Sequence, residues 1–432
     1  MSIDAFGPGM ISSIGEAHSK QRKLINPVFS SKNLQRVTPV LYEVIHRLTR
    51  GIRTLVKDGT AEVDVGRYMG RTALELISRA VIGRSLDPLT ETKSHPYAEG
   101  LKTIFPAIYS LSNYFQFYGV LRPFIPSPLR RPLMNMLPSR RVKGLLQSID
   151  TIYANAVTIY VEKKRDVEST DQVSEIEEAP GRARDLISIL LYANARASEG
   201  DTLSEEELIA SLSTLIFAAT DTTSNALSRV FDCIVKRPDV QTKLREEIMA
   251  AKQVHSGGDL SYDELLALPY LDAVLRETLL TRPAPFDFAN STLPLSKPVR
   301  GTDGTFMHSI FVPKGTLVFV PVHAANTNPA LWGRDARQWR PERWLAPLPD
   351  ALTEAKIPGV YSHLMTFWGG GRACIGFKFA ELEMKIVLAE LLSAFTFEDA
   401  GKPVAWNIGE VVYPTVGQDS PVPAFPMKVT AL

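Results

Sequence analysis

The stretch that most constrains this chain is Phe367 to Gly376, which reads Phe-Trp-Gly-Gly-Gly-Arg-Ala-Cys-Ile-Gly. It contains Cys374, one of only two cysteines in 432 residues, and an amphipathic helix pattern follows directly. Unpaired N–H groups and the positive dipole end at a helix N-terminus favour a thiolate over a thiol. Glycines let the backbone pass close to a flat or bulky ligand. Cys374 is therefore a candidate ligand for a metal whose other positions are not filled by protein.

Heme iron held by a thiolate fits this description, although a lone cysteine is more often a small buried hydrophobe. The loop resembles the heme-binding loop of the cytochrome P-450 family at five positions: Phe367, Gly370, Arg372, Cys374 and Gly376. The resemblance implies heme b, with Cys374 as the axial iron ligand. It also implies that Phe367 packs under the heme and that Arg372 pairs with a propionate. A phosphate-binding loop is set aside, because Phe377 stands where that loop needs lysine.

Charge and cysteine content narrow the function classes. Lys and Arg number 48 against 47 Asp and Glu, so no global positive field attracts nucleic acid. Two cysteines in different contexts indicate a reducing compartment rather than a disulfide framework. No multi-ligand metal spacing occurs in the sequence, and no uncharged run reaches the roughly 18 residues that cross a membrane. We expect a protein that does not span a bilayer.

His18 and Arg22 lie four residues apart, hence on one face of a helix, and both can donate hydrogen bonds to an anion. Without context, this pattern is more typical of a surface helix with scattered charge. The family has a helix here whose aromatic and arginine residues contact heme propionates; Arg22 matches, and His18 stands where tryptophan is common. In the family a membrane anchor, a first helix and the first sheet strands precede this helix. Almost none of that segment is present, so we expect an N-terminally incomplete fold.

A second chemical pattern lies in a long helix expected from Ser204, which forms a capping box with Glu207, to about Lys236. Asp221 and Thr222 interrupt its apolar middle, where an unpaired polar group would cost several kcal/mol. A satisfied helix kink is the commoner explanation. The stretch resembles the family's oxygen-activation motif, which implies Asp221 as proton relay and Thr222 as the hydroxyl that steadies oxygen.

The resemblance also assigns pocket and structural residues. The residues expected to face the substrate are apolar and favour a hydrophobic molecule: Phe217, Ala218, Ala284, Pro285 and Phe286. Glu277 and Arg343 match two members of the family's bracing triad, but Leu280 stands where the triad has its other arginine. Leucine cannot satisfy a buried carboxylate, so we expect either weakened heme retention or a faulty sequence around Leu280 to Ser291. Unchanged heme occupancy and stability in a Leu280→Arg variant would refute the weakening.

Three weaker patterns complete the fold expectation. Leu265 to Leu280 is expected as one continuing helix, Gly315 to Val322 as a strand, and Val412 to Val429 as a closing hairpin. The aromatic and proline-rich stretch from Phe105 to Pro138 is either a loop packed on the core or a mobile lid that dips into a membrane surface; we favour the lid.

Together these patterns predict a mainly α protein with a small β region, residues 1–432 forming a single heme-thiolate monooxygenase domain of cytochrome P-450 fold. By resemblance to fungal microsomal members, it would insert one atom of O₂ into a hydrophobic substrate of secondary metabolism. Electrons would come from NADPH through a separate NADPH-cytochrome reductase, at the cytosolic face of the endoplasmic reticulum membrane. Two alternatives stay open: an enzyme of the same fold that rearranges or dehydrates without a reductase, and an inactive heme-binding chain. NADPH dependence separates the first from the monooxygenase, and a visible spectrum identifies the second.

Overall fold

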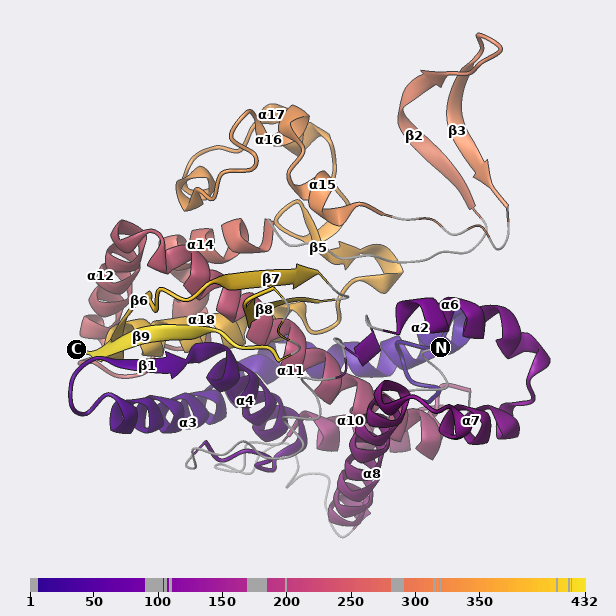
Figure 1. Cartoon of the computed structure of the whole chain (residues 1–432), viewed down its shortest axis with the longest axis horizontal. Helices are drawn as coiled ribbons and strands as arrows, with labels where there is room; N and C mark the ends of the chain where they lie inside the picture. Colours follow the sequence, from indigo (N-terminus) through magenta and orange to yellow (C-terminus); the bar gives the residue numbers. More distant parts are fainter. Residues whose placement is uncertain are drawn as a thin grey trace.

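The fold is mainly helical, with four small β-sheets (Figure 1). The computed structural model describes residues 7–89, 104, 107–108, 111–168, 185–198, 200–280, 291–313, 316, 318, 320–408, 411–418, 420 and 422–432. The α-helices are α2 (Gly15–Ile25), α3 (Ser31–Leu55), α4 (Val65–Ile77), α6 (Ser112–Leu121), α7 (Ser127–Met136), α8 (Arg140–Glu168), α10 (Leu186–Ala195), α11 (Glu205–Val235), α12 (Pro238–Val254), α13 (Tyr262–Ala267), α14 (Pro269–Leu280), α15 (Val322–Asn326), α16 (Pro329–Trp332), α17 (Asp350–Glu354) and α18 (Phe377–Ala394). Short 3₁₀ segments are η1 (Asn26–Phe29), η3 (Arg122–Phe124), η4 (Pro341–Leu345) and η5 (Gly370–Arg372), and η2 (Ser78–Ile82) is a π turn. The prediction of a mainly α protein with a small β region is confirmed.

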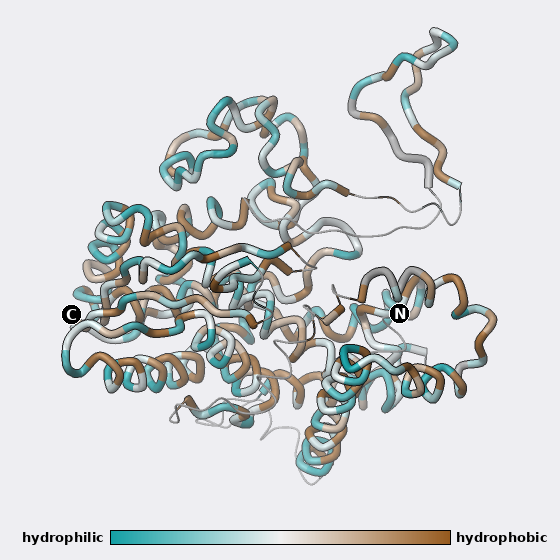
Figure 2. The backbone as a smooth tube through the Cα atoms, viewed as in Figure 1, coloured by the Kyte–Doolittle hydropathy of each residue, from teal (hydrophilic) through white to brown (hydrophobic). Residues whose placement is uncertain are grey.

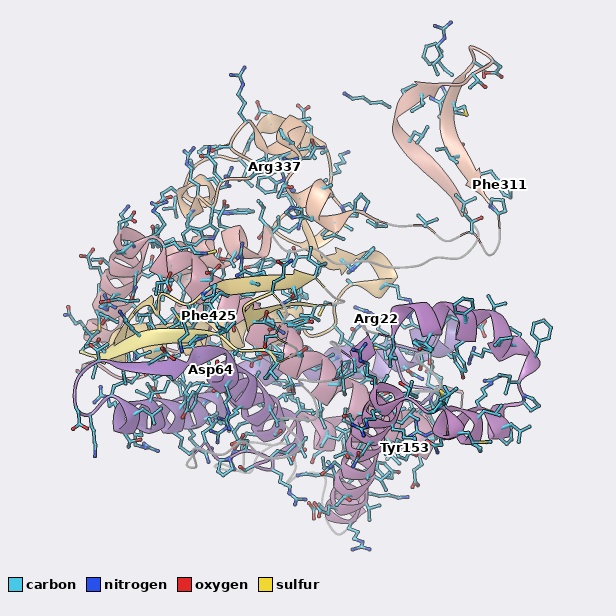
Figure 3. All side chains as sticks on the ribbon, viewed as in Figure 1. Arg22, Asp64, Tyr153, Phe311, Arg337 and Phe425 are labelled. Carbon is cyan, nitrogen blue, oxygen red and sulfur yellow. The ribbon has the colours of Figure 1, made fainter. Side chains whose placement is uncertain are left out.

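The strands form one three-stranded sheet and three hairpins. Their bounds are β1 (Ala61–Asp64), β2 (Ser291–Arg300), β3 (Phe306–Val312), β4 (Gly359–Tyr361), β5 (Leu364–Gly369), β6 (Phe395–Asp399), β7 (Val404–Ile408), β8 (Val412–Val416) and β9 (Pro426–Ala431). The sheet has the order β1-β9-β6, and β2–β3, β4–β5 and β7–β8 pair antiparallel. Asp64 ends β1 and caps α4: its Oδ1 accepts from the N–H groups of Arg67 (3.1 Å) and Phe425 (2.9 Å) (Figure 3).

Helix α11 runs through the middle of the molecule and packs against α4, α8, α14 and α18 (Figure 1). Its start follows the expected capping box, since Ser204 accepts from the N–H of Glu207 and the Glu207 side chain accepts from the N–H of Ser204. Along α18, Phe379, Leu382 and Ile386 are buried, as the apolar period predicts. The hydrophobic cores beneath these helices form one continuous cluster within the described chain.

Three local expectations are wrong. Residues 265–280 form two helices, because the chain leaves the helix at Leu268 and Pro269 begins α14, where its missing N–H costs nothing. The Val412–Val429 stretch does not form a hairpin of β8 with β9, since β8 pairs with β7 and β9 inserts between β1 and β6. Within the described part of the stretch, antiparallel pairing is limited to an isolated bridge between Thr415 and Pro423. In the Gly315–Val322 stretch the described positions form no strand, because Thr316 closes a turn onto Pro313 and Val322 opens α15.

A buried ion pair stabilises α4. The Arg71 guanidinium donates to both oxygens of Asp87, at 2.8 and 2.7 Å, and both side chains are only 2% exposed. This planar, bidentate geometry offsets the desolvation of both charges. Nearby, Arg84 and Glu162 form a pair of similar distance, 2.7 Å, but each side chain is about half exposed.

We predict that Arg71→Met lowers the free energy of unfolding by about 3–5 kcal/mol, because it leaves the Asp87 carboxylate buried without its counter-charge. Urea unfolding measures the loss. Arg84→Met is the matched control and should change stability by less than about 1 kcal/mol, since water solvates both of its charges. Equal losses in the two variants would contradict this account.

Candidate functional site

The Cys374 loop begins in the β4–β5 hairpin and ends at the first turn of α18. Cys374 is exposed, and its N–H donates to the Phe367 carbonyl at 2.8 Å, which closes the loop. Gly370 has a φ of +63°, in the region where glycine costs least. At Gly370, and likewise at Gly371 and Gly376, an added Cβ would meet no atom within 4 Å. The loop therefore leaves open space on the side where these glycines have no side chain.

Neighbouring contacts hold this loop in place. The Phe367 ring packs on Tyr361 and Phe377, with centroids 5.6 and 6.2 Å apart. One residue earlier, the Thr366 hydroxyl donates to the Leu279 carbonyl at 2.6 Å and accepts from Asn326 at 2.9 Å. Strand β5 is thereby tied to the end of α14.

Three donor side chains from distant segments meet beside the loop. Arg22 of α2, labelled in Figure 3, donates to the Ala373 carbonyl at 2.6 Å, and Arg372 donates to the Ser13 carbonyl at 2.7 Å. His18 is buried, and its pKa is lowered first by that burial and then by the charges of Arg372 and Arg22. Burial and the Arg22 charge likewise lower the pKa of Arg372. The three side chains are thus close enough to repel one another.

This cluster fits a ligand with anionic groups. Within the described residues, neither Arg22 nor Arg372 forms a salt bridge with a carboxylate, and their hydrogen bonds go to neutral backbone carbonyls. Two adjacent guanidinium groups held this way favour binding of carboxylate or phosphate groups. The loop offers a thiol and open glycine positions, and a cationic cluster lies beside it. This combination matches the chemistry of heme, whose iron takes a soft ligand and whose propionates are anionic.

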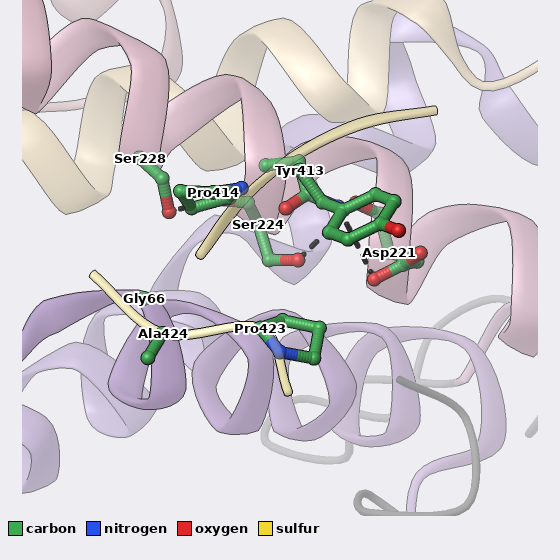
Figure 4. Close-up of a pocket in the computed structure, with 9 residues that line it drawn as sticks. Gly66, Asp221, Ser224, Ser228, Tyr413, Pro414, Pro423 and Ala424 are labelled. Atoms are coloured by element: carbon green, nitrogen blue, oxygen red, sulfur yellow. Dashed lines mark hydrogen bonds between the residues drawn. The ribbon is translucent and has the colours of Figure 1, made fainter. Parts of the chain in front are cut away.

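The oxygen-motif residues lie on α11, which packs against α18, the helix that follows Cys374. The Thr222 hydroxyl donates to the Ala218 carbonyl at 2.7 Å, and Thr222 itself is partly exposed. The Asn225 amide donates to the Asp221 carboxylate at 3.2 Å and to its carbonyl at 2.8 Å. Asp221 also lines a small pocket together with Ser224, Ser228 and Tyr413 (Figure 4). The carboxylate thus stands among polar groups that can hold water.

The substrate-facing residues are only partly within the described chain. Phe217 is buried and Ala218 is partly exposed, both on α11. Ala284, Pro285 and Phe286 lie outside the described residues.

Glu277 and Arg343 do meet, as expected. The Arg343 Nε lies 2.9 and 3.1 Å from the two Glu277 oxygens, which also accept from the Arg340 N–H (2.8 Å) and the Trp344 indole N–H (2.9 Å). Burial raises the pKa of Glu277, while these donors act in the opposite direction. The expectation that the carboxylate lacks partners without an arginine at position 280 is wrong, since Leu280 is fully buried in the core instead. Weaker heme retention stays a prediction.

Sequence reasoning missed three positioning contacts. Trp344 takes the place of a second charged partner for Glu277. Gln21, fully buried, donates to Ser13 and to Glu207, which ties α2 to the start of α11. Asn326 holds β5. No sequence pattern signals that Gln21 is buried, because its burial depends on contact with Glu207, which is far away in the chain.

Another potential group of metal ligands exists among the described residues: His46, Asp259 and Glu390. His46 Nε2 lies 2.9 Å from Asp259 and 3.6 Å from Glu390. The Lys252 ammonium already pairs with Glu390, so the group is satisfied as an ion-pair network.

We predict that Arg343→Met lowers the free energy of unfolding by about 3–5 kcal/mol, because the buried Glu277 loses its counter-charge. Arg340→Met is the matched control: its backbone N–H bond to Glu277 survives, and its side chain, 56% exposed, pairs with Asp335 among the described residues. Its effect should stay below about 1 kcal/mol. Thermal unfolding of both variants checks this, and a small loss in Arg343→Met would argue against the bracing role.

Comparisons with known proteins agree with this geometry. The family described as Cytochrome P450 matches residues 3–416. Cytochrome P450 monooxygenase 91 of Postia placenta is 46% identical over 429 residues, which cover 98% of this chain and 78% of that protein. Ganoderic acid synthetase CYP5150L8 of Ganoderma lucidum is 43% identical over 435 residues, covering 99% and 79%. A crystal structure of a cytochrome P450 (CYP102L1) matches the fold with a TM-score of 0.70 at 21% identity, covering 100% of this chain and 82% of that one. The chain belongs to the cytochrome P450 family of heme-thiolate monooxygenases.

Proposed function

We propose that this chain binds heme b through Cys374 and inserts one oxygen atom from O₂ into a hydrophobic organic substrate. The single observation that carries the proposal is the exposed Cys374 on a loop with open glycine positions and an adjacent cluster of two arginines and a histidine. In this proposal, residues 1–432 act as one domain. Bound heme supplies the electron transfer and oxygen activation that no protein side chain provides.

The protein's own residues have distinct parts in this proposal. The Cys374 sulfur would hold the heme iron, and Phe367 would pack beside this sulfur. Arg22 and Arg372 neutralise the propionates, where His18 adds one neutral N–H donor, because its lowered pKa disfavours the charged form. The glycines Gly370 and Gly376 let the ring approach the backbone.

Proton supply is assigned to α11. Asp221 holds and releases a proton at its carboxyl group, beside a small pocket to which Ser224 and Ser228 also contribute hydroxyl groups. Thr222 donates its own hydrogen to Ala218, so its oxygen lone pairs remain available to accept a hydrogen bond. Phe217 and Ala218 on the same helix, and Pro285 and Phe286, give the substrate apolar contacts and exclude water.

Electrons come from a separate NADPH-cytochrome reductase, which we infer from the family, and the substrate belongs to secondary metabolism. The ganoderic acid synthetase among the relatives supports the substrate assignment. Product formation that requires both NADPH and reductase separates this reaction from a reductase-independent rearrangement.

Peripheral contact with the cytosolic face of the endoplasmic reticulum membrane is the last part of the proposal. No helix in the described chain combines the length and apolarity that crossing a bilayer demands. Side chains on and after α6 and α7 are apolar yet exposed, and the connecting turn is hydrophobic in Figure 2: Tyr114, Phe117, Val120, Leu121, Phe124, Leu129, Leu133, Met136 and Leu137. We call this set the α6–α7 patch. An exposed apolar area of this kind suits insertion into the headgroup region.

We predict that Cys374→Ala abolishes the thiolate-type absorbance of the reduced carbon monoxide complex. Cys233→Ala is the matched control and should leave the spectrum unchanged, because Cys233 is buried in α11 and burial raises the pKa of its thiol to about 12. Retention of the absorbance in Cys374→Ala, or its loss in Cys233→Ala, would overturn the ligand assignment.

We also predict that Phe117→Glu combined with Phe124→Glu weakens binding to anionic phospholipid vesicles by on the order of tenfold or more. Burial of one phenylalanine contributes about 1.5–3 kcal/mol, and each ring is more than 70% exposed in the free protein. Val254→Glu, 79% exposed at the end of α12, is the control outside the patch. Vesicle sedimentation measures both, and equal binding by all variants would remove the α6–α7 patch from the proposal.

A further inference from the structure

Glu383 on α18 is a buried carboxyl group of unusual environment. Its side chain is fully buried, and neither oxygen has a hydrogen-bond partner at normal distance among the described residues. Glu277, equally buried, accepts four hydrogen bonds. Glu383 lies nine residues after Cys374, in the same helix that the cysteine loop leads into. The burial of Glu383 therefore cannot be explained by ion pairing, as the burial of Glu277 beside Arg343 can.

The surroundings of Glu383 favour its neutral form. An ionised carboxylate without partners in a dry core costs many kcal/mol, so such a group keeps its proton. Burial raises the pKa of Glu383 well above its usual range, and the Thr223 hydroxyl of α11 is the polar group that acts against this. The charges near α18 are engaged elsewhere: Lys385 pairs with Asp272 and Glu381, and Lys252, from α12, pairs with Glu390.

In the segment of α11 that contains Thr223, several side chains hydrogen-bond to the helix's own backbone. Three side chains there bond back to carbonyls four residues earlier: Thr220 to Ile216, Thr222 to Ala218, and Asn225 to Asp221. Such bonds compete with the helix ladder and favour bending. Thr223, 3% exposed, stands in the middle of this segment. A bond from outside the helix would hold the segment in one position.

We propose that Glu383 is a positioning residue: as a neutral carboxylic acid it hydrogen-bonds Thr223 and holds the Asp221–Thr222 segment of α11 in a fixed place against α18. Because α18 begins three residues after Cys374, this bond sets the oxygen-motif helix relative to the cysteine loop. Its catalytic meaning rests on the proposed function, but the bond and the protonation state do not.

The first test is infrared difference spectroscopy of the purified protein. The carbonyl stretch of a protonated carboxylic acid should be present in wild type and lost in Glu383→Gln. Glu381→Gln is the matched control two residues away; Glu381 pairs with Lys385 at 3.1 Å, so this variant should retain the band. A wild-type spectrum without a band that depends on Glu383 overturns the proposal.

The second test measures unfolding against pH. The folded state holds a proton that the unfolded state releases above a pKa of about 4.5, so raising the pH favours unfolding. Between that pH and the raised folded pKa, the unfolding equilibrium constant of wild type should increase by up to tenfold per pH unit relative to Glu383→Gln. Equal pH slopes contradict a neutral Glu383.

A double-mutant cycle tests the bond itself. Glu383→Leu and Thr223→Val should each destabilise, and the double variant should cost less than the sum, because both remove one interaction. Additive losses would mean that the two side chains do not interact.

A last measurement is electron coupling, the amount of product formed per NADPH consumed. It should fall in Glu383→Leu and in Thr223→Val, and it should stay near the wild-type value in Glu383→Gln. If the protein passes the spectroscopic, pH and stability tests but shows no turnover, the proposed function is refuted and the Glu383–Thr223 bond is supported. If the enzyme turns over but lacks the Glu383 infrared band, the bond is refuted and the proposed function is supported.

Discussion

The burial of α18 is the constraint on which the rest of the structure depends. Cys374 belongs to a short exposed loop, and such a loop by itself has no fixed position. The helix that follows is anchored on all sides, by α3, α11, α12 and α13. On its preceding side, the loop is held by β5, which Thr366 and Asn326 tie to α14 and α15. The buried core on both sides of the loop thereby fixes the position of the Cys374 sulfur.

Two fully buried glutamates show two ways to keep a polar group inside this core. Glu277 has an arginine, an indole N–H and a backbone N–H around it, so its charge can be matched. Neither oxygen of Glu383 has a hydrogen-bond partner at normal distance among the described residues, and in our proposal this carboxyl group stays neutral. Both residues connect elements that carry site residues: Glu277 joins α14 to η4, and in our proposal Glu383 joins α18 to α11. Buried polar contacts here serve mainly to define the positions of helices.

The local expectations that succeeded depend on neighbours in sequence. The Ser204–Glu207 capping box and the amphipathic period of α18 involve residues three or four apart, so their outcome is independent of distant segments. The continuing helix across Pro269 and the Val412–Val429 hairpin failed for the opposite reason. Strand pairing of β9 with β1, which is more than 360 residues away, outweighed pairing with the adjacent β8. Glu381 and Lys385, four residues apart on α18, form a local ion pair, but Lys385 is buried and also pairs with Asp272 of the distant α14.

By itself, the sequence determined the family chemistry through the spacing of five loop residues, Phe367, Gly370, Arg372, Cys374 and Gly376, which resembles the family's heme-binding loop. Only the tertiary structure decided what surrounds it. The meeting of His18, Arg22 and Arg372 and the three donors on Glu277 bring together residues far apart in the chain, and the isolation of Glu383 depends on the same packing. Their burial and charge environment arise from packing, which local sequence patterns do not encode.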